Sequence, residues 1–341
     1  MNGDQAASPA RDSFDRPLRD LRVSVTDRCN FRCQYCMPAG DEGCTAFLGR
    51  GQLLAFEEIA RLVRVFARLG VRKVRLTGGE PLLRNGLPDL VAQLTAIPSL
   101  DVALTTNGAL LPGLARRLKD AGMRRVTVSL DSLDEQVFQT MNGAGFPVWK
   151  VLEGIAAASD AGLDPIKINT VVIRGVNDGS VVDLARWFKG TGHIVRFIEY
   201  MDAGNAARWS PDAVLSGAEI VRMISAELPL RPADANYRGE VARRWRYADG
   251  SGEIGVVTSV SQPFCGDCTR ARLSADGVLY NCLFSNAGLD LREPLRSGAT
   301  DDEIDSLIRS RWGRRADRYS ELRSTQPRNP RQRIEMSYIG G

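Results

Sequence analysis

Three cysteines near the amino end of this 341-residue chain have a spacing that suits an iron–sulfur cluster. Cys29, Cys33 and Cys36 are separated by three and then two residues, with two aromatic residues among them. A cubane cluster has four irons and is normally held by four thiolates. Three closely spaced thiolates therefore leave one iron with an open coordination position, where a small molecule can bind and react.

A second set of three cysteines, Cys265, Cys268 and Cys282, lies near the other end of the chain. Its CxxC element could be half of a zinc site, but structural zinc sites are closed and four-coordinate, and no fourth ligand is nearby in the sequence. The second trio therefore favours another cluster with an open iron. For the first trio, a zinc site that uses Cys44 as its fourth ligand is the alternative.

The elements that position these cysteines alternate between strands and helices. We expect strands at 21–26, 71–76, 102–106, 125–130, 166–173 and 194–200, with helices at 56–69, 87–94, 114–121, 148–161 and 181–189. Strands separated by helices pair in parallel, so that polar residues after each strand meet at one face. Six units are too few to close an eight-stranded barrel. The pattern predicts an α/β fold, an incomplete (βα)6 TIM-type barrel whose missing wall comes from later in the chain.

Four regions are expected along the chain. Residues 1–16 are polar without periodicity and predict a mobile arm, and 17–209 form the partial barrel. Residues 210–323 have shorter strand patterns and predict a small α+β subdomain that carries the second trio. Composition alone predicts a flexible tail for 324–341, which ends in Gly340-Gly341.

Composition restricts the class of protein. A hydrophobic content of 43% supports a real core, while no apolar run approaches the length of about 18 residues that a membrane span needs. The amino end lacks a secretory signal, so we expect a cytoplasmic protein with no membrane partner. Because 45 basic residues are nearly balanced by 41 acidic ones, no nucleic-acid partner is expected. A single histidine, His193, makes histidine-based catalysis improbable.

The first trio, together with Thr77-Gly78-Gly79-Glu80-Pro81 after the second strand, resembles the radical S-adenosylmethionine (SAM) superfamily. The resemblance implies a [4Fe-4S] cluster whose open iron chelates SAM and whose electron cleaves it to a 5′-deoxyadenosyl radical. The positions that match SAM contacts in that superfamily are Tyr35, Gly79, Ser129 and Met201.

Both trios, Arg270-Ala271-Arg272 and the terminal Gly-Gly together resemble the GTP 3′,8-cyclase family of molybdenum cofactor biosynthesis. The resemblance implies a second [4Fe-4S] cluster that binds the guanine of GTP, hydrogen abstraction from C3′, and C3′–C8 bond formation. The positions that match GTP contacts are Arg22, Arg75, Thr106, Lys167, Arg196, Arg270 and Arg272, and the last two are implied in catalysis with Gly340 and Gly341.

Two of these positions are supported by the residues themselves. A lysine in an apolar strand, such as Lys167, needs an anion or an exit to water. Arg270 and Arg272 are two apart in an expected strand, so they point to one face and could grip an anionic group with forked hydrogen bonds.

The resemblance also implies partners. It implies a reductant such as flavodoxin or ferredoxin and a downstream cyclic pyranopterin monophosphate synthase, with the enzyme itself a monomer or homodimer. Two other classes are alternatives. A peptide-modifying radical SAM enzyme would share the first trio but usually has more auxiliary cysteines, and a zinc protein that binds nucleic acid would need closed zinc sites and a concentrated basic surface.

Overall fold

In the computed structural model, the described residues are 9–37, 47–203, 209–325 and 334–340. Within them a single sheet has twelve strands in the order β12-β11-β10-β1-β2-β3-β4-β5-β6-β9-β8-β7. The strands from β10 through β1–β6 to β9 pair in parallel, and the edge strands pair antiparallel. The ends of this order, β12 and β7, are not hydrogen-bonded to each other in the described part of the chain, so the barrel is open.

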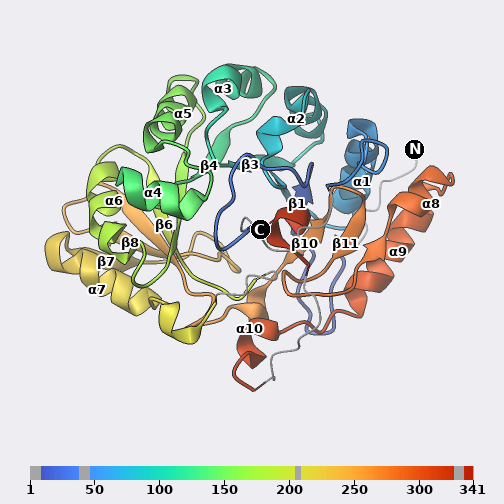
Figure 1. The fold of residues 1–341 in the computed structure, drawn as a ribbon. Coiled ribbons are helices and arrows are strands. Elements are labelled where there is room, and N and C mark those ends of the chain that lie inside the picture. Colours follow the sequence, from blue (N-terminus) through green and yellow to red (C-terminus); the bar gives the residue numbers. More distant parts are fainter. Residues whose placement is uncertain (1–8, 38–46, 204–208, 326–333, 341) are drawn as a thin grey trace.

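The predicted alternation of six strands and their helices is confirmed. The strands are β1 (Asp20–Ser24), β2 (Lys73–Thr77), β3 (Asp101–Thr106), β4 (Arg125–Ser129), β5 (Lys167–Val172) and β6 (Ile194–Glu199). The helices are α1 (Phe56–Arg68), α2 (Leu87–Thr95), α3 (Leu111–Asp120), α4 (Glu135–Asn142), α5 (Val148–Asp160) and α6 (Val181–Phe188). Figure 1 shows these helices around the outside of the curved sheet. The predicted fold class is therefore confirmed.

Residues after the sixth strand extend the sheet at both edges. On one side lie β7 (Leu230–Ala233), β8 (Arg243–Tyr247) and β9 (Glu253–Val257), and on the other β10 (Arg270–Leu273), β11 (Val278–Tyr280) and β12 (Leu289–Asp290). The remaining helices are α7 (Gly217–Glu227), α8 (Arg292–Arg296), α9 (Asp301–Gly313), α10 (Tyr319–Leu322) and α11 (Met336–Ile339). The expected later wall is thus built largely by adding strands to the same sheet.

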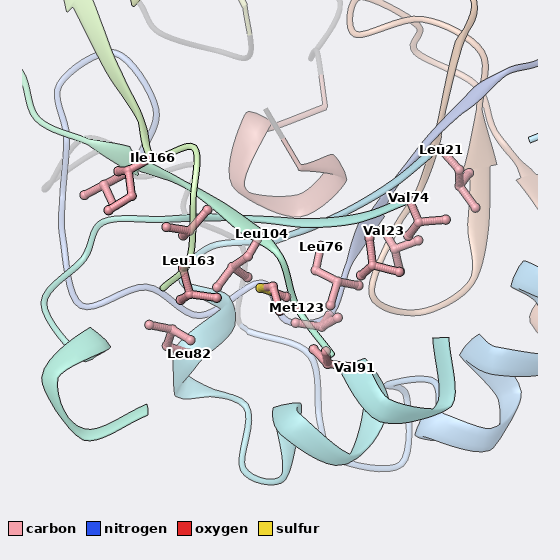
Figure 2. Packing of buried hydrophobic residues seen from close by; sticks show 14 of the residues in the cluster. Leu21, Val23, Val74, Leu76, Leu82, Val91, Leu104, Met123, Leu163 and Ile166 are labelled. Carbon is pink, nitrogen blue, oxygen red and sulfur yellow. The ribbon is translucent and has the colours of Figure 1, made fainter. Parts of the chain in front are cut away.

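The core lies between the sheet and the helices that cover its outer face. In β1 and β2 the apolar side chains alternate with charged ones, so Leu21, Val23, Val74 and Leu76 face the helices and are buried. Figure 2 shows these side chains packed together with Leu104 from β3. The alternate positions face the inside of the open barrel, where the site is built.

The prediction of a mobile arm is wrong for residues 9–16. The backbone N–H of Ala10 donates to the carbonyl of Leu69 at 2.9 Å, and Leu18 donates to the carbonyl of Ala10 at 2.8 Å. Asp12 and Arg16 are both buried and form an ion pair. A polar segment is stabilised here because its charges pair with residues far along the chain, which local composition does not reveal.

At residues 334–340 the flexible tail expected from composition alone is wrong, and the resemblance, which implies a role for Gly340 in catalysis, is the better guide. Residues 336–339 form α11, and Figure 1 shows this helix inside the ring of strands. Ser337 and Ile339 are buried. In the described residues, no helix has the length and apolarity needed to cross a membrane.

Candidate active site

The first cysteine trio lies in the loop that leaves β1. The loop is held by Phe31, whose ring packs against those of Phe138 and Phe146 at centroid distances of 6.2 and 5.1 Å. Turn hydrogen bonds join the N–H of Cys36 to the carbonyl of Cys33 at 3.0 Å. Tight backbone and aromatic packing therefore fix the loop that carries the three thiols.

The Gly-Gly loop after β2 packs directly on the start of the cysteine loop. The N–H of Gly79 donates to the carbonyl of Thr26 at 2.8 Å, and a Cβ at Gly79 would lie 2.3 Å from the carbonyl oxygen of Arg28. Only glycine allows this approach of two backbones. Glu80 is buried and accepts hydrogen bonds from the Thr106 hydroxyl at 2.7 Å and the N–H of Asn107 at 2.7 Å. These contacts position the carboxyl ends of β1, β2 and β3 as one unit.

A cavity with many charged side chains in its lining runs along the inner face of the sheet. It extends from residues that begin strands, such as Lys73 and Lys167, to Met201 just beyond β6. Its basic lining residues outnumber its acidic ones by nine to four: Arg22, Lys73, Arg75, Lys167, Arg196, Arg244, Arg270, Arg272 and Arg315 against Asp20, Glu240, Glu253 and Asp317. We call it the basic cavity. Its charge excess favours an anionic ligand.

Strand register places the central arginines side by side. Arg22 of β1 is the partner of both Arg272 in β10 and Arg75 in β2. Across the cavity, Arg196 of β6 is the partner of Gly255, and a Cβ at Gly255 would lie 3.0 Å from Cγ of Arg196. Glycine thus leaves room for this arginine. Like charges opposite each other on a sheet are destabilising, so the row is arranged for a bound anion.

The pKa values of these cations are lowered together. Burial, followed by the neighbouring guanidinium groups, lowers the pKa of Arg22 well below its usual value. Burial, with Arg75 next, lowers the pKa of Arg196 to about 9. Burial and nearby arginines lower the pKa of both Lys73 and Lys167 to about 8. Among the described residues, none of these four has a carboxylate within salt-bridge distance. A bound polyphosphate would offset the part of this lowering that comes from repulsion between the cations.

The second trio lies at the opposite end of β1 from the first. Cys265 and Cys268 come just before β10, which runs parallel to β1, whereas the first trio follows β1. All three thiols of the second trio line the basic cavity. Burial raises the pKa of Cys268, but the charges of Arg270 and Arg315 outweigh it and lower that pKa to about 6. The second trio is thus exposed to whatever the cavity binds.

Comparisons with known proteins agree with this geometry. The family model for the radical SAM superfamily matches residues 23–188, and the model described as Molybdenum Cofactor Synthesis C matches 193–321. A protein of Acidothermus cellulolyticus named GTP 3′,8-cyclase is 52% identical, with 98% of this chain and 99% of that protein covered. Proteins of the same name from Xanthomonas campestris pv. campestris (strain B100), with 100% of both chains covered, and Staphylococcus aureus (strain MRSA252), with 97% of this chain and 98% of that protein, are 52% and 45% identical.

This chain belongs to the GTP 3′,8-cyclase family. It is therefore a radical SAM enzyme. The names of its relatives favour cyclisation of GTP over the alternative activity, modification of a peptide. Among solved structures, Streptococcus suis SuiB bound to S-adenosylmethionine superposes with a TM-score of 0.60 at 15% identity, covering 86% of this chain and 68% of that one. At that identity the likeness shows the fold alone.

The thiols fit the two [4Fe-4S] clusters that the GTP 3′,8-cyclase family uses with SAM. Within the described residues, no three Cys, His, Asp or Glu side chains are grouped closely enough to hold a single metal ion. A cubane holds its thiolates farther apart than a single ion does, since each binds a different iron. Burial raises the pKa of Cys29 to about 11 and of Cys36 to about 12, so the thiolates form only with a cationic partner such as iron.

The positions that match SAM contacts in the family lie at the ends of different strands or in the loops that follow them. Tyr35 is in the cysteine loop, and its hydroxyl donates to Asp131 just after β4 at 2.8 Å. Gly79 is in the loop after β2, Ser129 ends β4, and Met201 follows β6 and lines the basic cavity. Their roles in binding SAM stay predictions.

The positions that match GTP contacts are brought together with one exception. Arg22, Arg75, Lys167, Arg196, Arg270 and Arg272 all line the basic cavity. Thr106 does not, because strand alternation turns its hydroxyl to Glu80; Thr105 faces the cavity and accepts from Nη1 of Arg75 at 2.9 Å. Sequence reasoning missed Lys73. Like Lys167, it is a lysine at the start of a strand, and this pattern could have identified it.

The carboxyl end of the chain reaches the cavity wall. Nη1 of Arg272 donates to the carbonyl of Gly340 at 3.2 Å, and Gly340 has a φ of +71° with Thr77 where a Cβ would be. Glycine is therefore required at this position. Gly341, which the resemblance implies in catalysis, and Cys44, the fourth ligand of the zinc alternative, lie outside the described residues.

Proposed function

We propose that this chain converts GTP to (8S)-3′,8-cyclo-7,8-dihydroguanosine 5′-triphosphate, the first step of molybdopterin biosynthesis. The observation that carries the proposal is the basic cavity, which offers an excess of cations beside the second trio of thiols and extends to Met201, just beyond β6. The relatives named GTP 3′,8-cyclase support the same activity.

Cys29, Cys33 and Cys36 would hold the first cluster, which with SAM would supply the radical chemistry that removes hydrogen from C3′ of GTP. The chain's own work is orientation, because a primary carbon radical attacks the nearest C–H bond. Tyr35, Gly79, Ser129 and Met201 would hold SAM at the carboxyl ends of the strands. Met201 also lines the basic cavity, so that a ligand on it would be next to the substrate.

The triphosphate would be held by the cations of the cavity. Arg22, Arg75 and Arg196 offer forked donors from three strands, and Lys73 and Lys167 add point charges at the amino ends of two strands. Burial strengthens each of these contacts because little water competes for the phosphate oxygens.

The guanine would be held at the second trio, with Arg270 and Arg272 beside it. Arg270 Nη2 donates to Sγ of Cys268 at 3.3 Å, and Arg272 is tied to Gly340. These two arginines, with Gly340 and Gly341, would stabilise the nucleotide while C3′ bonds to C8. Thr106 would act only through Glu80, since its hydroxyl does not face the cavity.

Other components are proposed from the chemistry. Reductive cleavage of SAM needs an electron donor such as flavodoxin or ferredoxin, and a cyclic pyranopterin monophosphate synthase would consume the product. We propose a cytoplasmic enzyme that acts as a monomer or homodimer. The division at residue 209 between the barrel and the subdomain with the second cluster is proposed as well.

The test is anaerobic reconstitution with iron, sulfide, SAM and a reductant, followed by incubation with each nucleoside triphosphate in turn. We expect GTP labelled with deuterium at C3′ to transfer the label to 5′-deoxyadenosine. Release of unlabelled 5′-deoxyadenosine with GTP unchanged would contradict the proposal, and preferential conversion of another triphosphate would redirect it.

A matched pair of variants tests the cavity. Arg22→Gln removes one charged hydrogen-bond donor, worth about 1.5–3 kcal/mol, so we expect the KM for GTP to rise about 10- to 100-fold. Arg116→Gln changes an exposed arginine of α3 that pairs with Asp120, and should leave KM unchanged. Equal KM values in the two variants would remove Arg22 from the binding site.

A further inference from the structure

A buried ion network lies behind the second trio, and none of its members matches a predicted contact with SAM or GTP. Asp12 Oδ2 accepts from Nε of Arg16 at 2.6 Å and from Nη1 of Arg315 at 3.1 Å. The side chains of Asp12, Arg16 and Arg315 are 0%, 3% and 1% exposed. The network joins residues from opposite ends of the chain.

Both arginines extend from Asp12 to the segments that carry the cysteines. Nη1 of Arg16 donates to the carbonyl of Cys265 at 2.6 Å, and Nη1 of Arg315 donates to the carbonyl of Cys268 at 2.7 Å. Nε of Arg315 donates to the carbonyl of Asn281, the residue before Cys282, at 3.1 Å. One carboxylate therefore orients the two side chains that tie down all three cysteine segments.

Arg315 also contacts a thiol directly. Its Nη2 donates to Sγ of Cys268 at 3.2 Å, while its guanidinium lies 4.6 Å from the ring centre of Trp312. Trp312 in turn donates through its indole N–H to the carbonyl of Arg16 at 3.2 Å. Asp317, partly exposed, lies 3.9 Å from Nε of Arg315. The guanidinium group of Arg315 is thus fixed by hydrogen bonds at its edge and by the Trp312 ring against its face.

Stability alone is a poor explanation for this arrangement. Burying a carboxylate and two guanidinium groups costs desolvation energy that an apolar cluster of equal volume avoids. Nη2 of Arg16 is buried without a hydrogen-bond partner among the described residues, which adds to the cost. The network makes sense if its purpose is to present donors to the cysteine segments and to what they bind.

We propose that Asp12, Arg16 and Arg315 are positioning residues for the second cluster. Asp12 orients the two arginines, the arginines set the spacing of the three cysteine segments, and the hydrogen bond from Arg315 to Cys268 raises the reduction potential of the cluster. Groups that orient ligands commonly affect metal retention, and N–H···S hydrogen bonds shift the potentials of iron–sulfur clusters. The inference rests on the proposed function only in taking the second trio to hold a cluster.

The experiment observes the second cluster alone. In full-length protein with Cys29, Cys33 and Cys36 all changed to Ala, the reconstituted chain carries only that cluster. We would measure the rate of iron release to a chelator, the electron paramagnetic resonance spectrum of the reduced cluster and its midpoint potential. None of these readouts requires GTP turnover, so failure of the proposed function and failure of this inference are distinguishable.

Asp12→Asn should speed iron release about 10- to 100-fold, since loss of such orienting partners weakens metal retention by that factor. The matched control is Asp15→Asn, the same change three residues away at an exposed carboxylate that pairs with Arg11. The control should release iron at the parent rate. Equal rates in the parent, Asp12→Asn and Asp15→Asn proteins would overturn the proposal.

Arg315 tests the effect on potential. Arg315→Gln removes the charge and should move the midpoint potential to more negative values, because the reduced cluster loses a donor that stabilises its added charge. Arg315→Lys keeps the charge and should fall between Arg315→Gln and the parent. An unchanged potential in both variants would refute the role assigned to the N–H···S hydrogen bond.

A general loss of folding would imitate the first result, so a second background separates the two. In protein with Cys265, Cys268 and Cys282 changed to Ala, only the first cluster remains. Asp12→Asn should leave iron release from that cluster unchanged. Loss of both clusters in the same proportion would mean that Asp12 merely stabilises the fold, and the proposal would be wrong.

Discussion

Among the polar contacts that hold α11, the hydrogen bond of Tyr338 can be removed with little other change. The hydroxyl of Tyr338, in α11, donates to the buried Asp276 carboxylate at 2.7 Å from each oxygen. Burial, together with Asp276, raises the pKa of Tyr338 far above neutral, so the hydroxyl keeps its proton. Since α11 is a single turn, its position depends on such contacts more than on its own helical hydrogen bonds.

Tyr338→Phe deletes this hydroxyl and leaves the ring, which packs at 6.5 Å from the ring of Tyr280. A hydrogen bond to a charged group is worth about 1.5–3 kcal/mol, and the buried Asp276 is still bound by Ser274 at 2.6 Å. Detachment of α11 should therefore become about 10- to 100-fold more frequent. Because Gly340 then leaves Arg272 more often, turnover of GTP should fall as well.

The assay is hydrogen exchange at the amides of positions 338 and 339, which donate to the carbonyl of Glu335 at 3.1 and 3.4 Å. Their exchange should accelerate by the same factor of about 10 to 100. Tyr247→Phe is the control, since it deletes a buried hydroxyl that donates to Ala185 far from α11. If exchange at 338 and 339 is equal in parent and Tyr338→Phe proteins while turnover falls, the reasoning that the hydroxyl anchors the tail is refuted.

Three further outcomes are expected. Gly79→Ala should abolish release of 5′-deoxyadenosine, because its Cβ would lie 2.3 Å from the carbonyl oxygen of Arg28; normal release would contradict the close approach of the two loops. The KM for GTP should rise as the pH passes from 7 to 9, since Lys73 and Lys167 have pKa values of about 8, so their charge is complete below that pH and lost above it; a flat profile would exclude them from phosphate binding. Reconstituted protein should hold about eight irons per chain and Cys265→Ala about four, measured by iron and sulfide analysis; zinc without sulfide would contradict two clusters.

The sequence predicts the barrel well because its strand signals are local. β-branched runs and helical spacing place all six strands within two residues of their observed starts. Alternation accounts for the inward side chains of Arg22 and Arg75, although their assignment as GTP contacts rests on the family resemblance. The same alternation distinguishes Thr105 from Thr106, but Thr106 was assigned from the family resemblance and not from the strand pattern.

Composition and local pattern failed mainly to predict that polar segments near the two ends of the chain are buried, and the reason is physical. Asp12 and Arg16 look like the residues of a solvated arm, and their burial becomes favourable only through Arg315, about three hundred positions away. Composition alone fails at the tail for a similar reason, because Tyr338 has a buried site only after β10 and the Asp276 turn are in place; there the family resemblance is the better guide. No local pattern encodes partners that lie 62 or 303 positions apart.

The neighbouring arginines on the inner face of the sheet explain why the pairing of β10 with β1 needs contacts from other parts of the chain. β10 brings Arg272 beside Arg22 in strand register, which opposes pairing since like charges are neighbours. The strand is nevertheless held, because Asp20 accepts from the hydroxyl of Thr269 at 2.6 Å and Arg315 binds the carbonyl of Cys268. Contacts at the amino end of β10 thus counter a repulsion that a bound triphosphate would relieve, and the same contacts fix the cysteines of the second trio. Substrate charge, strand pairing and cluster geometry are in this way parts of one arrangement.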